Sequence, residues 1–142
     1  MKKRILLAVI ALAAAMTVNA QTLVVYYSRS GCTQVAKDEL NAKARPELKA
    51  DIDISKYDTI YLGWPCWWGT MPMCVFTFLE AHDWTGKTVI PFTTHEGSGF
   101  GSGLRDLKAA VKGATVTKGL SIQGSKVNSA GKQIENFVNA TH

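Results

Sequence analysis

Residues with the chemistry of a ligand site are concentrated in three short stretches, 28–33, 64–71 and 93–103. The first stretch, SRSGCT, combines three hydroxyl side chains with a glycine at the expected start of a helix. Free backbone N–H groups at a helix start attract anions, and hydroxyls add donors without a fixed charge. This stretch therefore fits a bound phosphate, although the same residue types also form ordinary turns and helix caps.

The second stretch, GWPCWWGT, places Trp64, Trp67 and Trp68 within five positions of a turn. An exposed indole is costly unless the core, a partner or a flat ligand covers it. We expect the core to take at least one of the three. Because two adjacent tryptophans in a turn do not easily both point inward, a planar aromatic ligand would account for another.

The third stretch, TTHEGSGFGSG, has four glycines that let the backbone approach a ligand closely. The neighbours His95 and Glu96 suggest acid–base chemistry, and the alternative is a loop in which both are simply solvated. We favour the solvated loop over a catalytic role for His95.

The elements that must position these stretches alternate between strand and helix. Strands are predicted at 23–27, 59–63 and 88–92, with shorter ones at 114–117 and 120–122. Helices are predicted over 33–44, from residue 72, around 104–111 and around 134–138. This order predicts a mostly parallel sheet with helices on both faces, in which ligands bind beyond the carboxyl ends of the strands.

Other site motifs are absent from the sequence. Residues 97–102 lack the third glycine of the dinucleotide fingerprint, and residues 119–126 end in Gly-Ser-Lys, unlike a nucleotide P-loop. No Gly-x-Ser-x-Gly elbow occurs. Without a Cys-x-x-Cys pair, and with three scattered histidines, we expect no metal site.

The first twenty residues have the plan of a secretory signal peptide. A basic start precedes a short apolar run and the small residues Val18-Asn19-Ala20. The alternative is an N-terminal membrane anchor, for which the run is short. Cleavage would leave one domain, 21–142, with a charge of +2, exported to the periplasm or beyond, off the membrane and without the basic runs of a nucleic-acid binder. Its three cysteines are an odd number, so at least one is free or pairs elsewhere.

The chain resembles the flavodoxin family, and more closely its exported bacterial members. The resemblance lies in VVYYSRSGCT, YDTIYLGWPCWWGTMPM, FTFLE, GKTVIPFTTHEGSGFGSG and the last helix. It implies an α/β three-layer sandwich with a mostly parallel sheet, and non-covalently bound flavin mononucleotide (FMN). The matching residues are Ser28, Ser30, Gly31, Cys32 and Thr33 for the phosphate; Pro65, Trp67, Trp68 and Gly69 for one wall of the ring site; and Thr94, His95, Glu96, Gly97, Ser98 and Gly99 for the other wall.

The function that this resemblance implies is electron transfer, or the reaction of a small FMN-dependent oxidoreductase. The partner would be a redox protein or a small electron acceptor, and no side chain would need to act as acid, base or nucleophile. The alternative is a degenerate domain that keeps the fold as a binding or structural module. A hydrolase using His95, Glu96 and a serine is a weaker third hypothesis.

The resemblance fails between Cys32 and Asp51, where only one short helix is predicted. The second strand of the family, an edge of its sheet, is missing. Because crossovers between parallel strands are right-handed, we expect the helix after Thr33 to lie on the opposite sheet face from its usual one. The strand at 23–27 becomes an apolar edge, and such edges favour pairing with a second copy of the chain.

Overall fold

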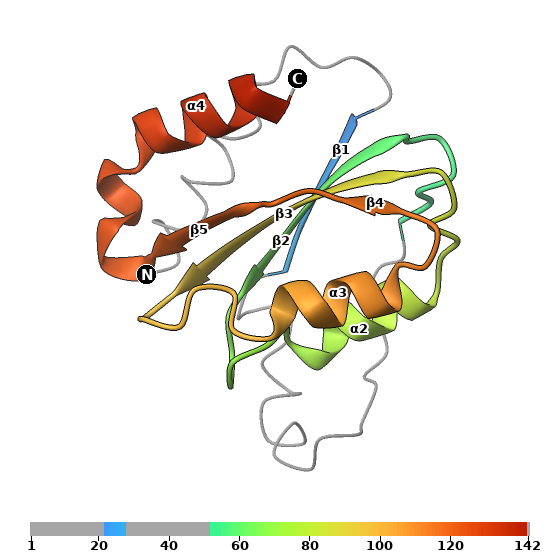
Figure 1. Cartoon of the computed structure of the whole chain (residues 1–142), viewed down its shortest axis with the longest axis horizontal. Coiled ribbons are helices and arrows are strands. Elements are labelled where there is room, and N and C mark those ends of the chain that lie inside the picture. The colour runs from blue at the N-terminus through green and yellow to red at the C-terminus, as the bar shows by residue number, and fades with distance from the viewer. Residues whose placement is uncertain (1–21, 28–51, 142) are drawn as a thin grey trace.

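A computed structural model describes residues 22–27 and 52–141 and places a five-stranded parallel sheet at the centre of the molecule (Figure 1). The strands are β1 (Thr22–Tyr26), β2 (Thr59–Pro65), β3 (Thr88–His95), β4 (Thr115–Val116) and β5 (Leu120–Gln123). Their order is β1-β2-β3-β4, and β5 also pairs with β3. All of these pairings are parallel, so the carboxyl ends of the strands gather at one edge of the sheet.

Helices cover both faces of this sheet, which makes three layers. The helices α2 (Met73–Glu80) and α3 (Gly103–Ala110) lie on one face, and α4 (Gly131–Thr141) lies on the other (Figure 1). A short 3₁₀ helix, η2 (Gly124–Ser129), joins β5 to α4. No helix in the described ranges is long and apolar enough to cross a membrane.

The alternation of side chains along β2 explains how one strand serves two cores. Ile60, Leu62 and Trp64 belong to the core under α2 and α3, whereas Tyr61 belongs to the core under α4. All four are fully buried. A strand buried on both faces has a continuous apolar sequence rather than an alternating one, which is the pattern of residues 59–64.

The predicted α/β architecture is therefore confirmed, and β2 and β3 extend past their predicted ends to carry the loops of interest. Within 22–27 and 52–141, β1 pairs only with β2, so no strand lies on its outer side there. The helix predicted after Thr33, and with it the expected change of face, lies outside the described residues. The predicted signal peptide and the predicted phosphate loop lie outside them too. Pairing of two chains through β1 stays a prediction.

A proline divides the outer edge of the sheet. β4 pairs with Thr88 and Val89, and β5 pairs with the stretch from Phe92 to His95. Between them, Pro91 faces the same neighbour as Val89, whose carbonyl accepts from Thr117 N. Since proline has no N–H to donate, the ladder is interrupted there, and the chain passes Pro91 at Gly119, where a Cβ would collide with it.

Candidate functional site

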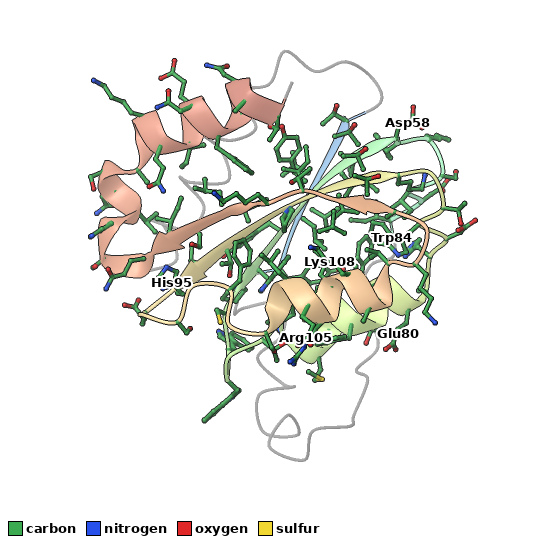
Figure 2. The ribbon with its side chains drawn as sticks, in the orientation of Figure 1. Asp58, Glu80, Trp84, His95, Arg105 and Lys108 are labelled. Carbon is green, nitrogen blue, oxygen red and sulfur yellow. The ribbon has the colours of Figure 1, made fainter. Side chains whose placement is uncertain are left out.

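A cavity of about 680 Å³ lies at the carboxyl edge of the sheet. Its size is within the range of sites for drug-sized ligands and cofactors. Figure 2 shows His95 beside the ends of β3 and β5, at the far end of the sheet from Asp58 and Trp84. The lining comes from three loops, after β2, β3 and β5: Pro65, Cys66, Trp67, Trp68, Gly69, Thr94, His95, Glu96, Gly97, Ser98, Gly124, Ser125 and Val127.

The structure brings most of the predicted ring-site residues together around this cavity. All four from the end of β2 and its following loop line it, as do Thr94, His95, Glu96, Gly97 and Ser98 from the end of β3 and its following loop. Gly99 does not line it, although it lies in the same loop. The predicted phosphate-loop residues, 28–33, fall outside the described residues. The predicted residues that the structure does describe thus form two of the cavity's three segments, about thirty residues apart in sequence.

The three tryptophans at the end of β2 and in its following loop differ in burial, as expected from their crowding. Trp64 is fully buried, and Trp67 is half-buried and bridged to Thr70 by two backbone hydrogen bonds of 3.0 Å. Trp68 is 81% exposed and has a φ of 53°, in the left-handed region that residues other than glycine rarely occupy. A strained backbone that presents an indole to solvent beside a cavity is typical of a ligand-contacting position.

Hydrogen bonds between β2 and β3 fix the second wall against the first. The hydroxyl of Thr93 donates to the carbonyl of Trp64 at 2.7 Å, and Cys66 N donates to the carbonyl of Thr94 at 2.8 Å. The thiol of Cys66 lies 3.4 Å from the hydroxyl of Ser98. The two walls are therefore joined at their bases by the sheet and higher up by a polar side-chain contact.

The loop after β2 is also tied to the start of α3. The carbonyl of Gly69 accepts from the backbone N–H of Ser102 at 2.7 Å and from its hydroxyl at 3.2 Å. The carboxylate of Asp106 accepts from Thr70 and Ser102, each at 2.6 Å. Burial alone would raise the pKa of Asp106, but these two hydroxyls and the neighbouring Arg105 together hold it below its ordinary value.

An aromatic pair lies on the α4 face of the sheet, next to the strand ends. Tyr26 and Phe92 stack with ring centroids 5.9 Å apart, on either side of Gly63. A Cβ at Gly63 would collide with both rings, so only glycine fits there. Burial raises the pKa of Tyr26 to about 12, although the nearby Thr94 side chain offsets part of the rise. The Tyr26 hydroxyl has no hydrogen-bond partner among the described residues.

The two cysteines among the described residues differ in oxidation state. Cys66 is a free thiol in the cavity wall, whereas Cys74, in the first turn of α2, is disulfide-bonded. The two are therefore not bonded to each other, which the sequence left open. The ranges 22–27 and 52–141 contain no group of His, Cys, Asp or Glu side chains that could hold a metal ion.

A third segment of the cavity was not predicted from the sequence. Gly124, Ser125 and Val127, at the start of η2, line the side formed by the chain after β5. Glu96 lies against this segment, because a Cβ at Gly124 would overlap its carboxylate. The sequence did hold one signal: residues 120–122 were predicted as a strand, and the loop after it belongs at the same sheet edge as the other two.

The parallel sheet, covered by helices on both faces, is a flavodoxin-like three-layer fold. The family model described as Flavodoxin matches residues 38–141, which is more than half of the chain. The chain belongs to the flavodoxin family. No curated protein matches it significantly.

Solved structures agree with this assignment. A Bacteroides uniformis protein assigned as a flavoprotein is 28% identical over 81% of this chain and 97% of its own, with a TM-score of 0.65. A similar Bacteroides eggerthii protein is 25% identical over 84% of this chain and 96% of its own, with a TM-score of 0.63. A Lactobacillus acidophilus flavoprotein in complex with FMN shares the fold, with a TM-score of 0.54. It is 22% identical over 77% of this chain and 97% of its own.

Proposed function

We propose that this chain binds FMN non-covalently in the cavity and carries electrons, either as a flavodoxin-like carrier or as a small flavin-dependent reductase. The observation that carries the proposal is the convergence of two family-matching loops on one cavity. One wall presents the indoles of Trp67 and Trp68, and the other presents the hydroxyl and backbone groups of residues 94–98. The complexes of FMN with flavodoxin-like proteins of other bacteria support it.

The residues present fit a flavin in chemistry as well as in size. A flat, mostly apolar ring system with polar atoms along one edge needs an aromatic wall and a wall of hydrogen-bond donors. Bound FMN would supply one- or two-electron chemistry, and the protein would hold and orient it. We propose that residues 28–33 hold its phosphate and that no side chain acts as nucleophile, acid or base.

The setting and the partner belong to the same proposal. We propose that residues 1–20 direct export and that the domain works outside the cytoplasm. The electron donor or acceptor would then be an exported redox protein or a small molecule. The disulfide at Cys74 supports an oxidising compartment, where disulfides persist.

The test is a visible absorption spectrum of the purified chain, followed by parallel titrations with FMN and with riboflavin. Flavin bands, or saturable quenching of added FMN fluorescence, are expected. Tighter binding of FMN than of riboflavin would show that the shortened segment still holds the phosphate. Equal binding of both would restrict the site to the two ring walls. A folded protein that binds neither would reject the proposal.

A further inference from the structure

His95 is the last residue of β3, and its ring is held by the loop that it begins. The backbone N–H of Gly97 donates to its Nδ1 at 2.9 Å. Gly97 itself has a φ of 149°, in the positive region that favours glycine. A ring nitrogen that accepts a hydrogen bond carries no proton. The ring is therefore neutral in this arrangement, and its single proton lies on Nε2.

The protonated nitrogen has no acceptor within the protein as described. Among residues 22–27 and 52–141, Gly97 is the only hydrogen-bond partner of the His95 ring. The nearest carboxylate in sequence, Glu96, lies instead against Gly124. Since His95 lines the cavity and Nδ1 faces its own loop, the rest of the ring is what a ligand meets.

We propose that His95 is a hydrogen-bond donor of the site, whose Nε2–H binds an acceptor atom on the edge of a bound flavin. The acceptor would be a carbonyl oxygen or an unprotonated ring nitrogen. The assignment rests on the proposed function. The Gly97 N–H fixes the tautomer, so the free protein is already prepared to donate. A planar ligand without an acceptor at that place would leave a polar group unpaired and bind less well.

The first experiment needs no flavin. Long-range ¹H–¹⁵N spectra of the ligand-free protein, near neutral pH, report which nitrogen of each histidine carries a proton. His82 is the internal contrast, because its Nδ1 lies 2.8 Å from the carbonyl of Phe78, which can only accept. We expect a protonated Nδ1 in His82 and an unprotonated Nδ1 with a protonated Nε2 in His95. A proton on Nδ1 of His95 would overturn the proposal.

Two substitutions separate the functions of the two ring nitrogens. His95→Asn keeps an acceptor near the position of Nδ1 but has no donor at the position of Nε2. His95→Gln places an N–H near Nε2 but gives up the acceptor for Gly97. The exchange rate of the Gly97 amide proton in the ligand-free variants reports the loop, and the Kd for FMN reports the ligand.

We expect His95→Asn to weaken FMN binding by about five- to tenfold with the Gly97 amide still protected, the loss of one hydrogen bond. We expect His95→Gln to stay within about threefold of the natural protein while Gly97 loses protection. Equal affinity of His95→Asn and the natural protein would overturn the donor role alone. A natural protein that binds no FMN would overturn the proposed function, and the donor role with it.

Discussion

The hydroxyl of Thr70 donates to the carboxylate of Asp106 at 2.6 Å and so joins the loop after β2 to the first turn of α3. The Asp106 side chain is only 22% exposed, so water screens this hydrogen bond incompletely. Because the loop carries Trp67 and Trp68 in its preceding positions, the same bond that supports the fold also holds one wall of the cavity.

Thr70→Val should lower the free energy of unfolding by about 1.5 kcal/mol at neutral pH, since a hydrogen bond to a charged group is lost. The folded-state pKa of Asp106 is depressed below its ordinary 3.8, so its stabilising contribution is present above that pH and is lost as the pH falls through the folded-state pKa. The difference between the two proteins should therefore shrink below pH 3.8. Urea unfolding at several pH values measures it.

The Asp106→Asn background provides the control for this prediction. Introducing Thr70→Val there should cost clearly less than in the natural protein, because the charged acceptor is already gone. An equal cost in both backgrounds would mean that Thr70 stabilises the loop in some other way.

Gly63→Ala should be strongly destabilising, by about 1–3 kcal/mol, because a methyl group there overlaps the stacked rings of Tyr26 and Phe92. The matched control is Gly131→Ala at the start of α4, where a Cβ meets nothing within 4 Å. That change should be neutral or slightly stabilising, as alanine favours a helix. Thermal unfolding of the two variants makes the comparison, and similar losses in both would contradict the packing argument.

Trp68→Gly should separate stability from binding. Glycine relieves the left-handed backbone at this position, and the lost side chain is 81% exposed, so unfolding should change by less than about 1 kcal/mol. FMN affinity should nevertheless fall by about tenfold, as the indole is an aromatic wall of the proposed site. Trp64→Phe is the contrasting variant, because it alters a fully buried indole and should mainly lower stability. Unchanged FMN binding by Trp68→Gly would remove Trp68 from the site.

The buried Tyr26 hydroxyl should make the fold sensitive to alkali. Burial raises its folded-state pKa from 10.0 to about 12, so the unfolded chain loses this proton first and stability falls as the pH rises above 10. Tyr26→Phe should match the natural protein near pH 7, since the hydroxyl has no partner among the described residues. Between pH 10 and 12 the variant should be the more stable of the two. Parallel loss of melting temperature in both would show that Tyr26 is not responsible.

Much of this architecture was predictable because its signals are local. The apolar runs of β2 and β3 and the carboxyl-end rule together place residues 64–69 and 94–98 at one edge of the sheet. What the sequence does not display is contact between distant segments. Nothing in the residues around Gly124 indicates that Glu96 lies against it. Nor does the sequence indicate that the Asp106 carboxylate accepts hydrogen bonds from the hydroxyls of Thr70 and Ser102. These contacts depend on how loops pack, which no periodicity encodes.

The tautomer of His95 also depends on a contact that the sequence does not display. In the sequence alone, His95 and Glu96 suggest acid–base chemistry or a loop in which both side chains are solvated. The distance between Gly97 N and the His95 ring changes that interpretation, because it makes the imidazole a neutral donor.

The proline at position 91 lies where the outer neighbour of β3 changes from β4 to β5. β4 pairs with the amino-terminal half of β3, and β5 pairs with its carboxyl-terminal half. β5 then leads into η2, which lines the cavity. Since the two pairings are separate, we expect the β5 segment and η2 to open as a subglobal unit while the Thr88–Val89 pairing stays closed. Native-state hydrogen exchange should then show lower protection in β5 than in β2. A ligand in the cavity would raise the protection of β5 selectively, so the outer strand would report occupancy of the site.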